Sequence, residues 1–164
     1  MQKLNCLLLN LVLSISIISS VNAQSNVTDL AFGNPGATGK RITAPNQKAD
    51  MHFRRSFNVS SETWGEKADG YRAKFTHHKV RYMVDYDKKG NWVSTIKSYD
   101  GTLLSPAIAK SVISAFPGFM IVHVIQVEMG NNRVHLVKIE DCHSLRTVRV
   151  SGGEMDVIES YRKE

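Results

Sequence analysis

The segment VDYDKKGNWVST has two aspartates and a glycine at the spacing of a calcium-binding loop. Asp85, Asp87 and Gly90 match the pattern D-x-D-x-x-G, which supplies carboxylate ligands and a sharp turn. However, Lys89 puts a cation at the fifth position, where an oxygen ligand is needed, and Ile96 replaces the bidentate glutamate of the twelfth. The residues on both sides of this segment alternate between apolar and polar types, as they do in strands. We therefore interpret DKKGN as a hairpin turn with positive φ at Gly90, and we predict no metal and no cofactor.

The histidines and the cysteine are the other residues that could do chemistry. His77 and His78 are adjacent, and adjacent side chains on a strand point to opposite faces, so they do not readily share an ion. Cys142 and His143 are neighbours in sequence, which does not by itself give the hydrogen-bonding geometry of a catalytic pair. Because Cys142 stands in the strand-like stretch IEDCHSL, we expect a buried or half-buried cysteine.

A candidate binding surface comes from the strands predicted before and after DKKGN. In YRAKF and VRYMVDY, apolar side chains alternate with basic or polar ones, so one face is apolar and the other points away from the core. Basic and aromatic groups on such an open sheet face are typical anchors for a protein partner. The predicted site comprises Trp64, Arg72, Lys74, Arg81, Met83, Lys97 and Tyr99. No aromatic-stacking signature of a nucleic-acid-binding module is present, so we expect no nucleic acid.

Two predicted helices must support these strands. Residues 46–57 carry Ala49, Phe53 and Phe57 on one helical face, with Asn46 as a possible N-cap. SSETWGEK follows as a short extended segment, and YRAKF, VRYMVDY and WVSTIKSY follow as strands.

The second predicted helix spans residues 105–116, with Ser105 as N-cap and Pro106 at the first helical position. Its apolar stripe consists of Ile108, Val112 and Phe116, widened by Ala109 and Ile113. Four more strands follow it: FMIVHVIQVEM, RVHLVKIEDC, LRTVRV and MDVIESYR.

The two halves of the chain, about 45–100 and 104–162, have the same order of elements. The turns at Gly90 and Gly153 correspond, and each is followed by a strand that begins with a large apolar residue. Repetition of this kind indicates an internal duplication. Each half has one apolar helix stripe and one apolar sheet face, which bury each other. The predicted fold class is α+β, with about eight antiparallel strands and two helices packed on one face.

The N-terminus has the layout of a cleaved secretory signal. A short polar start with Lys3 leads into an apolar run, and small residues end at Ala23. We expect residues 1–23 to be removed, residues 24–44 to form a flexible leader and residues 45–164 to form the domain. The product would be exported, to the periplasm or outside the cell, without a stable membrane span. Cleavage lowers the formal charge from +6 to +5 and leaves one cysteine, Cys142, so no disulfide within the chain is possible.

The motifs FTHHKVRYMVDYDKKGNWVST, LLSPAIAKSVISAFPGF and VRVSGGEMDVIES make the chain resemble the secreted PepSY-like, β-lactamase-inhibitor-protein-like proteins of Bacteroidetes. The resemblance covers roughly residues 45–162. It implies a tandem helix-and-sheet module without a catalytic set, which inhibits or regulates a peptidase or other hydrolase through its open sheet face. The residues with which those proteins contact their targets are not recognisable in this sequence.

These observations predict a protein-binding module and not an enzyme, with another envelope or secreted protein as its partner. Two alternatives stay open. One is a carrier of a small ligand or peptide, which requires an apolar cavity between helices and sheet. The other is a hydrolase that uses histidine and aspartate groups on the sheet.

Overall fold

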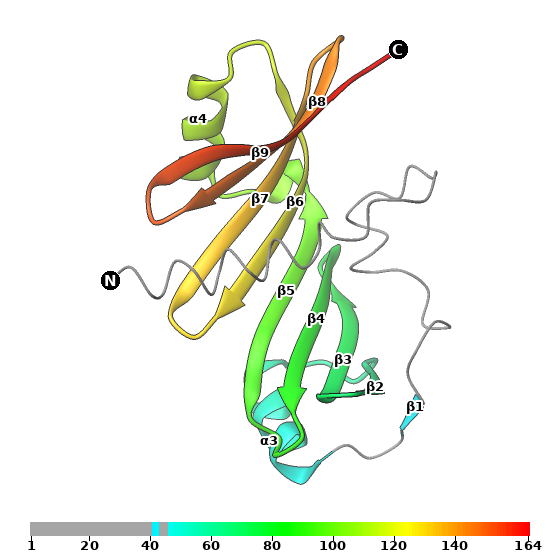
Figure 1. The fold of residues 1–164 in the computed structure, drawn as a ribbon. Helices are drawn as coiled ribbons and strands as arrows, with labels where there is room; N and C mark the ends of the chain where they lie inside the picture. The colour runs from blue at the N-terminus through cyan, green and yellow to red at the C-terminus, as the bar shows by residue number, and fades with distance from the viewer. Residues whose placement is uncertain (1–40, 43–45) are drawn as a thin grey trace. The chain divides into compact units, whose positions relative to one another are not determined.

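The computed structural model describes residues 41–42 and 46–164 (Figure 1). The predicted signal peptide, the predicted leader except for residues 41 and 42, and residue 45 of the predicted domain lie outside the described residues. Nine antiparallel strands form one sheet in which each strand pairs with the next along the chain. They are β1 (Arg41–Ile42), β2 (Thr63–Lys67), β3 (Gly70–His77), β4 (Val80–Asp87), β5 (Trp92–Asp100), β6 (Met120–Met129), β7 (Asn132–Glu140), β8 (Ser144–Ser151) and β9 (Glu154–Arg162).

The eight longer strands and the two helices α3 (Gln47–Ser56) and α4 (Pro106–Ala115) confirm the α+β prediction, and helix plus four strands occurs twice. The order of connection is simple. α3 lies in the connection from β1 to β2, η1 (Gly101–Leu103) and α4 lie between β5 and β6, and every other strand is joined to the next by a short turn. One boundary differs from the prediction. Arg41 and Ile42, placed in the flexible leader, pair with Gly65 and Trp64 of β2.

Helix α3 forms as its sequence predicts. The Asn46 side chain accepts hydrogen bonds from the backbone N–H groups of Lys48, at 2.9 Å, and Ala49, at 3.4 Å, which otherwise have no partner in the first turn. Ala49 and Phe53 are fully buried. They pack on the side chains of β2, β3 and β4, so α3 closes a first hydrophobic core.

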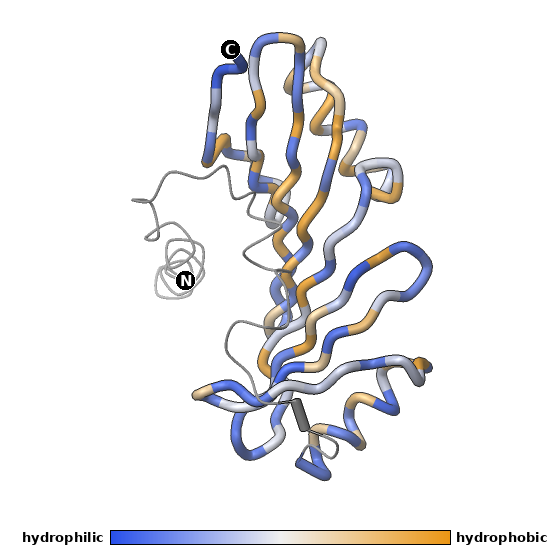
Figure 2. The backbone as a smooth tube through the Cα atoms, turned by 90° about the vertical axis from the view of Figure 1, so that its right-hand side faces the viewer, coloured by the Kyte–Doolittle hydropathy of each residue, from blue (hydrophilic) through white to orange (hydrophobic). Residues whose placement is uncertain are grey.

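Helix α4 begins with Pro106 at its first position, but the Ser105 side chain makes no capping hydrogen bond. Val112 is fully buried in a second core that contains side chains of β5 to β8. Ile113 was expected to widen the apolar stripe and is instead 49% exposed, because it lies one position round the helix from Val112. Both helices lie on the same side of the sheet (Figure 2).

Strand β7 ends earlier than predicted, which changes the setting of the cysteine. The Asp141 side chain accepts hydrogen bonds from the backbone N–H groups of His143, at 2.8 Å, and Ser144, at 2.6 Å, and this turns the chain. Cys142 therefore lies in an exposed bend and not in a strand, which corrects the expectation that it is buried.

Candidate functional site

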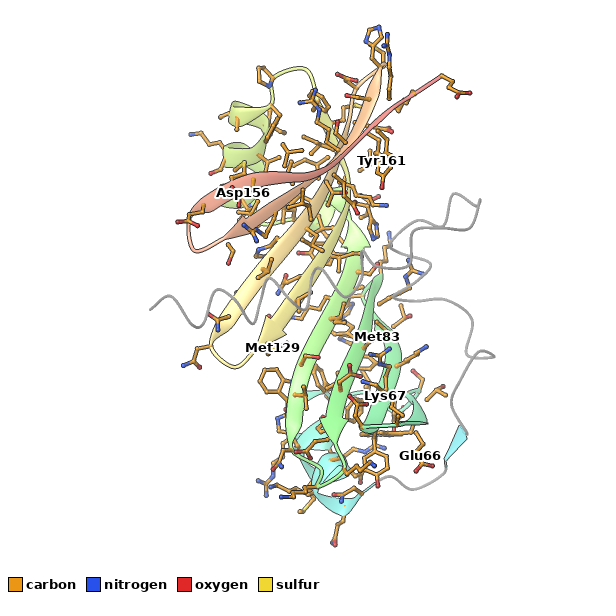
Figure 3. The ribbon with its side chains drawn as sticks, viewed as in Figure 1. Glu66, Lys67, Met83, Met129, Asp156 and Tyr161 are labelled. Carbon is orange, nitrogen blue, oxygen red and sulfur yellow. The ribbon has the colours of Figure 1, made fainter. Side chains whose placement is uncertain are left out.

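The register of the sheet divides its side chains between a face covered by α3 and α4 and an opposite one, here called the helix-free face. Four of the predicted site residues lie on the helix-free face. Arg72 is paired in register with Asp85, Lys74 with Met83, and Arg81 with Ser98. Their neighbours Ala73, Val84 and Tyr86 belong to the first core, on the other side. Arg72, Lys74, Arg81 and Met83 are thus brought to one surface over β3 and β4, and Met83 is labelled in Figure 3.

Trp64 lies on the other face, so its predicted place on the open surface is wrong. It is 5% exposed, and its ring centroid is 5.3 Å from that of Phe53 and 5.6 Å from that of Tyr86. The cause is register: Trp64 is paired with Ala73, whose side chain points into the first core. A five-residue strand has too few alternating positions for its phase to be read from the sequence.

Lys97 and Tyr99 also lie on the helix side, which corrects their predicted position. Asp85 is paired with Ser94 and Tyr86 with Trp92, so Val93 is an extra residue that shifts the phase of β5. Tyr99 is buried in the second core and donates a hydrogen bond to Gln126 Oε1 at 2.9 Å. Burial raises the pKa of Tyr99 to about 12.

Asp85, considered above as a calcium ligand, instead pairs with two cations, Arg72 and Lys67. Arg72 Nε donates to Asp85 Oδ1 and Arg72 Nη2 to Asp85 Oδ2, both at 2.6 Å. This is the two-pronged geometry that suits a guanidinium and a carboxylate. Lys67 Nζ lies 3.3 Å from the same carboxylate. The hydrogen bond to Asp85 is the main reason why the pKa of Arg72 is raised. Arg72 is therefore fixed by a partner within the chain.

Lys74 is the cation next to that pair and has a different environment. Within the described part of the chain it makes no hydrogen bond or ion pair of its own, and on β3 it stands between Ala73 and Phe75, whose side chains belong to the first core. Burial lowers its pKa, and the positive charge of Arg72 lowers it further. An acidic group from a partner would relieve both effects, because it would favour the charged ammonium.

An apolar patch extends from these cations across the middle of the helix-free face. Met83 is opposite Ile96, Ile96 is opposite Val127, and Ile125 is opposite Leu136. Four of the side chains have little exposure: Met83 1%, Ile125 5%, Val134 7% and Leu136 7%. Residues of the patch are Met83, Ile96, Ile125, Val127, Val134 and Leu136. The sequence did not identify the patch, because it arises only when β4 to β7 are placed in register.

Ser98 and His123 form an arrangement on this face that resembles a catalytic pair. Ser98 Oγ lies 2.9 Å from His123 Nε2, and Asp100 is opposite His123 in the sheet. Burial lowers the pKa of His123, as do Lys138 and Arg81. However, Asp100 Oδ1 accepts hydrogen bonds from the backbone N–H of Thr102, at 2.9 Å, and from its hydroxyl, at 2.6 Å, and so caps η1.

That geometry gives a structural hydrogen bond and not a working nucleophile. Ser98 is only 1% exposed, so a substrate carbonyl would have no access to its oxygen. The carboxylate of Asp100, which would have to orient the imidazole, already accepts the hydrogen bonds of Thr102.

The remaining candidate residues form two pairs of sequence neighbours, His77–His78 and Cys142–His143. His77 and His78 are exposed at the β3–β4 turn, with ring centroids 3.9 Å apart. Cys142 Sγ lies 2.9 Å from His143 Nδ1 in the bend after β7. Among residues 41–42 and 46–164, no three histidine, cysteine, aspartate or glutamate side chains are grouped so that they could hold a metal ion.

No protein-family profile matches the chain, and no curated protein matches it. Solved structures share its fold. A BLIP-like protein from Bacteroides fragilis superposes with a TM-score of 0.57 at 18% identity, over 74% of this chain and 88% of that one. A DUF2874 family protein from Bacteroides ovatus gives 0.56 at 14% identity, over 74% and 89%. A protein from Bacteroides eggerthii, described provisionally as periplasmic, gives 0.54 at 12% identity, over 73% and 89%.

These likenesses show that the chain shares the fold of BLIP-like and DUF2874 family proteins from Bacteroides. At such identities, fold is what is shared, and function must be argued from the surface. In the described part of the chain, neither helix has the length and apolar character needed to cross a membrane.

Proposed function

We propose that this chain is an exported binding module whose helix-free face engages an acidic surface of another envelope or secreted protein. In this proposal residues 1–23 direct export to the periplasm or the outside of the cell and are then removed. The domain that follows acts by binding and not by catalysis. The likeness to BLIP-like and provisionally periplasmic proteins supports the location and the mode of action at the level of fold.

The observation that carries the proposal is the arrangement of cations beside the apolar patch. Lys74 is paired with Met83, Arg81 lies two residues from Met83 on β4, and the Arg72–Asp85 pair lies on the other side of Met83 along the strands. An apolar centre with a charged border is the usual composition of a protein-binding surface. The chain is basic, with a sequence pI of about 9.4, so long-range attraction favours an acidic partner.

The partner that best suits the family resemblance is a peptidase or other hydrolase, which the module inhibits or regulates by covering its surface. Two helices support the sheet from the other side, so the face is a rigid platform. A rigid platform loses little conformational entropy when it binds, which favours a tight and specific complex.

Charge reversal on the helix-free face tests the proposal. The mature protein, its Lys74→Glu and Arg81→Glu variants, and a Lys110→Glu control on exposed α4 are used to capture proteins from the envelope fraction of the source cells. A captured protein is then purified, and its affinity for each variant is measured by calorimetry at two salt concentrations. We expect the two face variants to bind at least tenfold more weakly, and Lys110→Glu to bind as the parent does.

The Lys110→Glu control separates the effect of charge on the helix-free face from the effect of net charge, because all three substitutions change the net charge equally. Equal loss in all three variants would point to non-specific attraction, and no loss in any would place the interface elsewhere. Either result would contradict the proposal. If the partner is a hydrolase, its activity should fall in proportion to the bound fraction.

A further inference from the structure

The hairpin that joins β3 to β4 carries two adjacent histidines at its tip. His77 is the last residue of β3 and pairs with Val80, the first residue of β4, so the loop consists of His78 and Lys79. Both loop residues have positive φ, +47° at His78 and +65° at Lys79. Two positive φ angles in a two-residue loop define a type I′ turn. The chain therefore reverses directly after His77.

This turn is made from residues that do not favour it. Type I′ loops prefer asparagine and glycine, because a residue with a larger side chain is strained at positive φ. Among the described residues, His78 and Lys79 are the ones other than glycine that have positive φ. Strained residues of this kind are concentrated at functional sites. The turn thus directs attention to the side chains that it presents.

The strained turn brings the two imidazole rings together. Their centroids are 3.9 Å apart, and their planes are inclined at 62°. On a regular strand, adjacent side chains point to opposite faces, and for this reason the sequence predicts no shared ion. The structure removes that objection, because His78 belongs to the turn and does not continue the strand. Both side chains are exposed, so their rings are free to rotate about the side-chain bonds.

The two rings have a spacing that suits a pair of ligands for one metal ion. A histidine nitrogen binds Zn²⁺ at about 2.0–2.1 Å, so two nitrogens that share an ion of this size lie within about 4 Å of each other. Rings whose centroids are 3.9 Å apart reach this spacing by rotation of the side chains, without movement of the backbone. Neutral imidazole is the commonest metal ligand in proteins.

Two imidazoles with open positions beside them suit Cu²⁺ better than Zn²⁺ or Ca²⁺. Structural zinc sites use four protein ligands, but residues 41–42 and 46–164 contain no group of three or more histidine, cysteine, aspartate or glutamate side chains. Ca²⁺ requires oxygen ligands. Cu²⁺ accepts a tetragonal set of nitrogen and oxygen ligands and binds most tightly of the divalent first-row ions. The neighbouring cation Lys79 is exposed, so water and salt screen its charge.

We propose that His77 and His78 form a chelating site for Cu²⁺ at the tip of the β3–β4 hairpin, with water in the other coordination positions. This site goes beyond the proposed function and does not depend on it. Neither of the cations tested by charge reversal, Lys74 and Arg81, is a ligand. Either proposal can therefore fail without the other.

Titration of the mature chain with Cu²⁺ tests the site. Every protein carries Cys142→Ser, because a free thiol also binds and reduces copper. We expect calorimetry to show one Cu²⁺ per chain, and paramagnetic broadening to remove the ring-proton signals of His77 and His78 from the NMR spectrum first. His77→Gln and His78→Asn should each weaken binding at least tenfold, because a chelate needs both rings. His143→Gln removes another exposed histidine and should leave the affinity within twofold of the parent.

The His78→Asn variant also separates loss of a ligand from loss of the fold. Asparagine is favoured in this turn, so the urea midpoint should stay the same or rise while copper binding falls. If His77→Gln unfolds the protein, His78→Asn decides the test. Two histidines that bind ions independently would leave the remaining one with the parent's affinity in each variant, and this result would overturn the proposal. Equal copper binding by the parent and all variants would overturn it as well.

Discussion

At the scale of single residues, Gly90 shows how a turn and a helix depend on each other. Its φ is +80°, as predicted for the DKKGN turn, and a Cβ there would lie only 2.2 Å from Asn46 Oδ1. That oxygen caps α3 through Lys48 and Ala49. Glycine is thus required at position 90 for two reasons: the positive φ of its backbone, and the close approach of the Asn46 side chain that caps α3. The sequence predicted the first requirement, but the second depends on residues 44 positions apart.

Replacement of Gly90 by alanine should therefore cost more than backbone strain alone. The positive φ costs about 1–2 kcal/mol, and a disturbed N-cap costs about 1 kcal/mol more. Gly118→Ala is the matched control, because Gly118 has φ of +87° and open space around its Cβ position. Urea unfolding should show a larger loss of stability for Gly90→Ala. Equal losses would mean that the contact with Asn46 contributes nothing.

At the scale of elements, each helix buries one apolar stripe on the strands of its own core. A single step round the helix decides which residue supports that core. Val112 is fully buried whereas Ile113 is 49% exposed. Helical periodicity predicted the stripe of α4 but included Ile113, because an apolar residue at the border of a stripe looks the same in sequence whether or not the sheet reaches it.

This difference predicts opposite results for two adjacent substitutions. Val112→Ala removes two buried methyl groups and should lower the free energy of unfolding by about 1.5–3 kcal/mol. Ile113→Ala removes exposed atoms and introduces a better helix former, so stability should change by about 0.5 kcal/mol or less. Chemical denaturation of both variants measures the difference. A large loss for Ile113→Ala would show that another surface packs on α4.

At the scale of the whole described domain, two separate hydrophobic cores share one sheet, and polar groups of the central strands lie between them. Lys97 Nζ is 3.0 Å from Glu128 Oε1, and Gln126 Nε2 donates to the same oxygen at 2.7 Å. His135 is opposite Gln126 and only 8% exposed. Burial lowers its pKa, as do Arg133 and Lys97, while Glu128 and a hydrogen bond with the backbone of Val150 act in the other direction.

This buried histidine should make stability depend on pH. Its pKa is lower in the folded state, so the unfolded chain binds more protons as the pH falls below about 6.5. The stability that neutral His135 contributes is complete above that pH and is lost as the pH falls through the folded pKa. Urea unfolding at pH 7.5, 6.5 and 5.5 should show this decline, and His135→Gln should reduce it. An unchanged pH profile in the variant would show that His135 is not responsible.

The sequence by itself determined the class of fold. Alternation in YRAKF and VRYMVDY defined the two faces of β3 and β4. The N-cap residue Asn46 and the helix-starting residue Pro106 placed the two helices, because these signals act between residues close in the chain. The tertiary structure alone decided which face each remaining residue joins. The extra residue Val93 reversed the expected positions of Lys97 and Tyr99, and pairing with Ala73 buried Trp64. Cross-strand register likewise created the Arg72–Asp85 pair and the apolar patch, because a shift of one residue moves every later side chain to the other face.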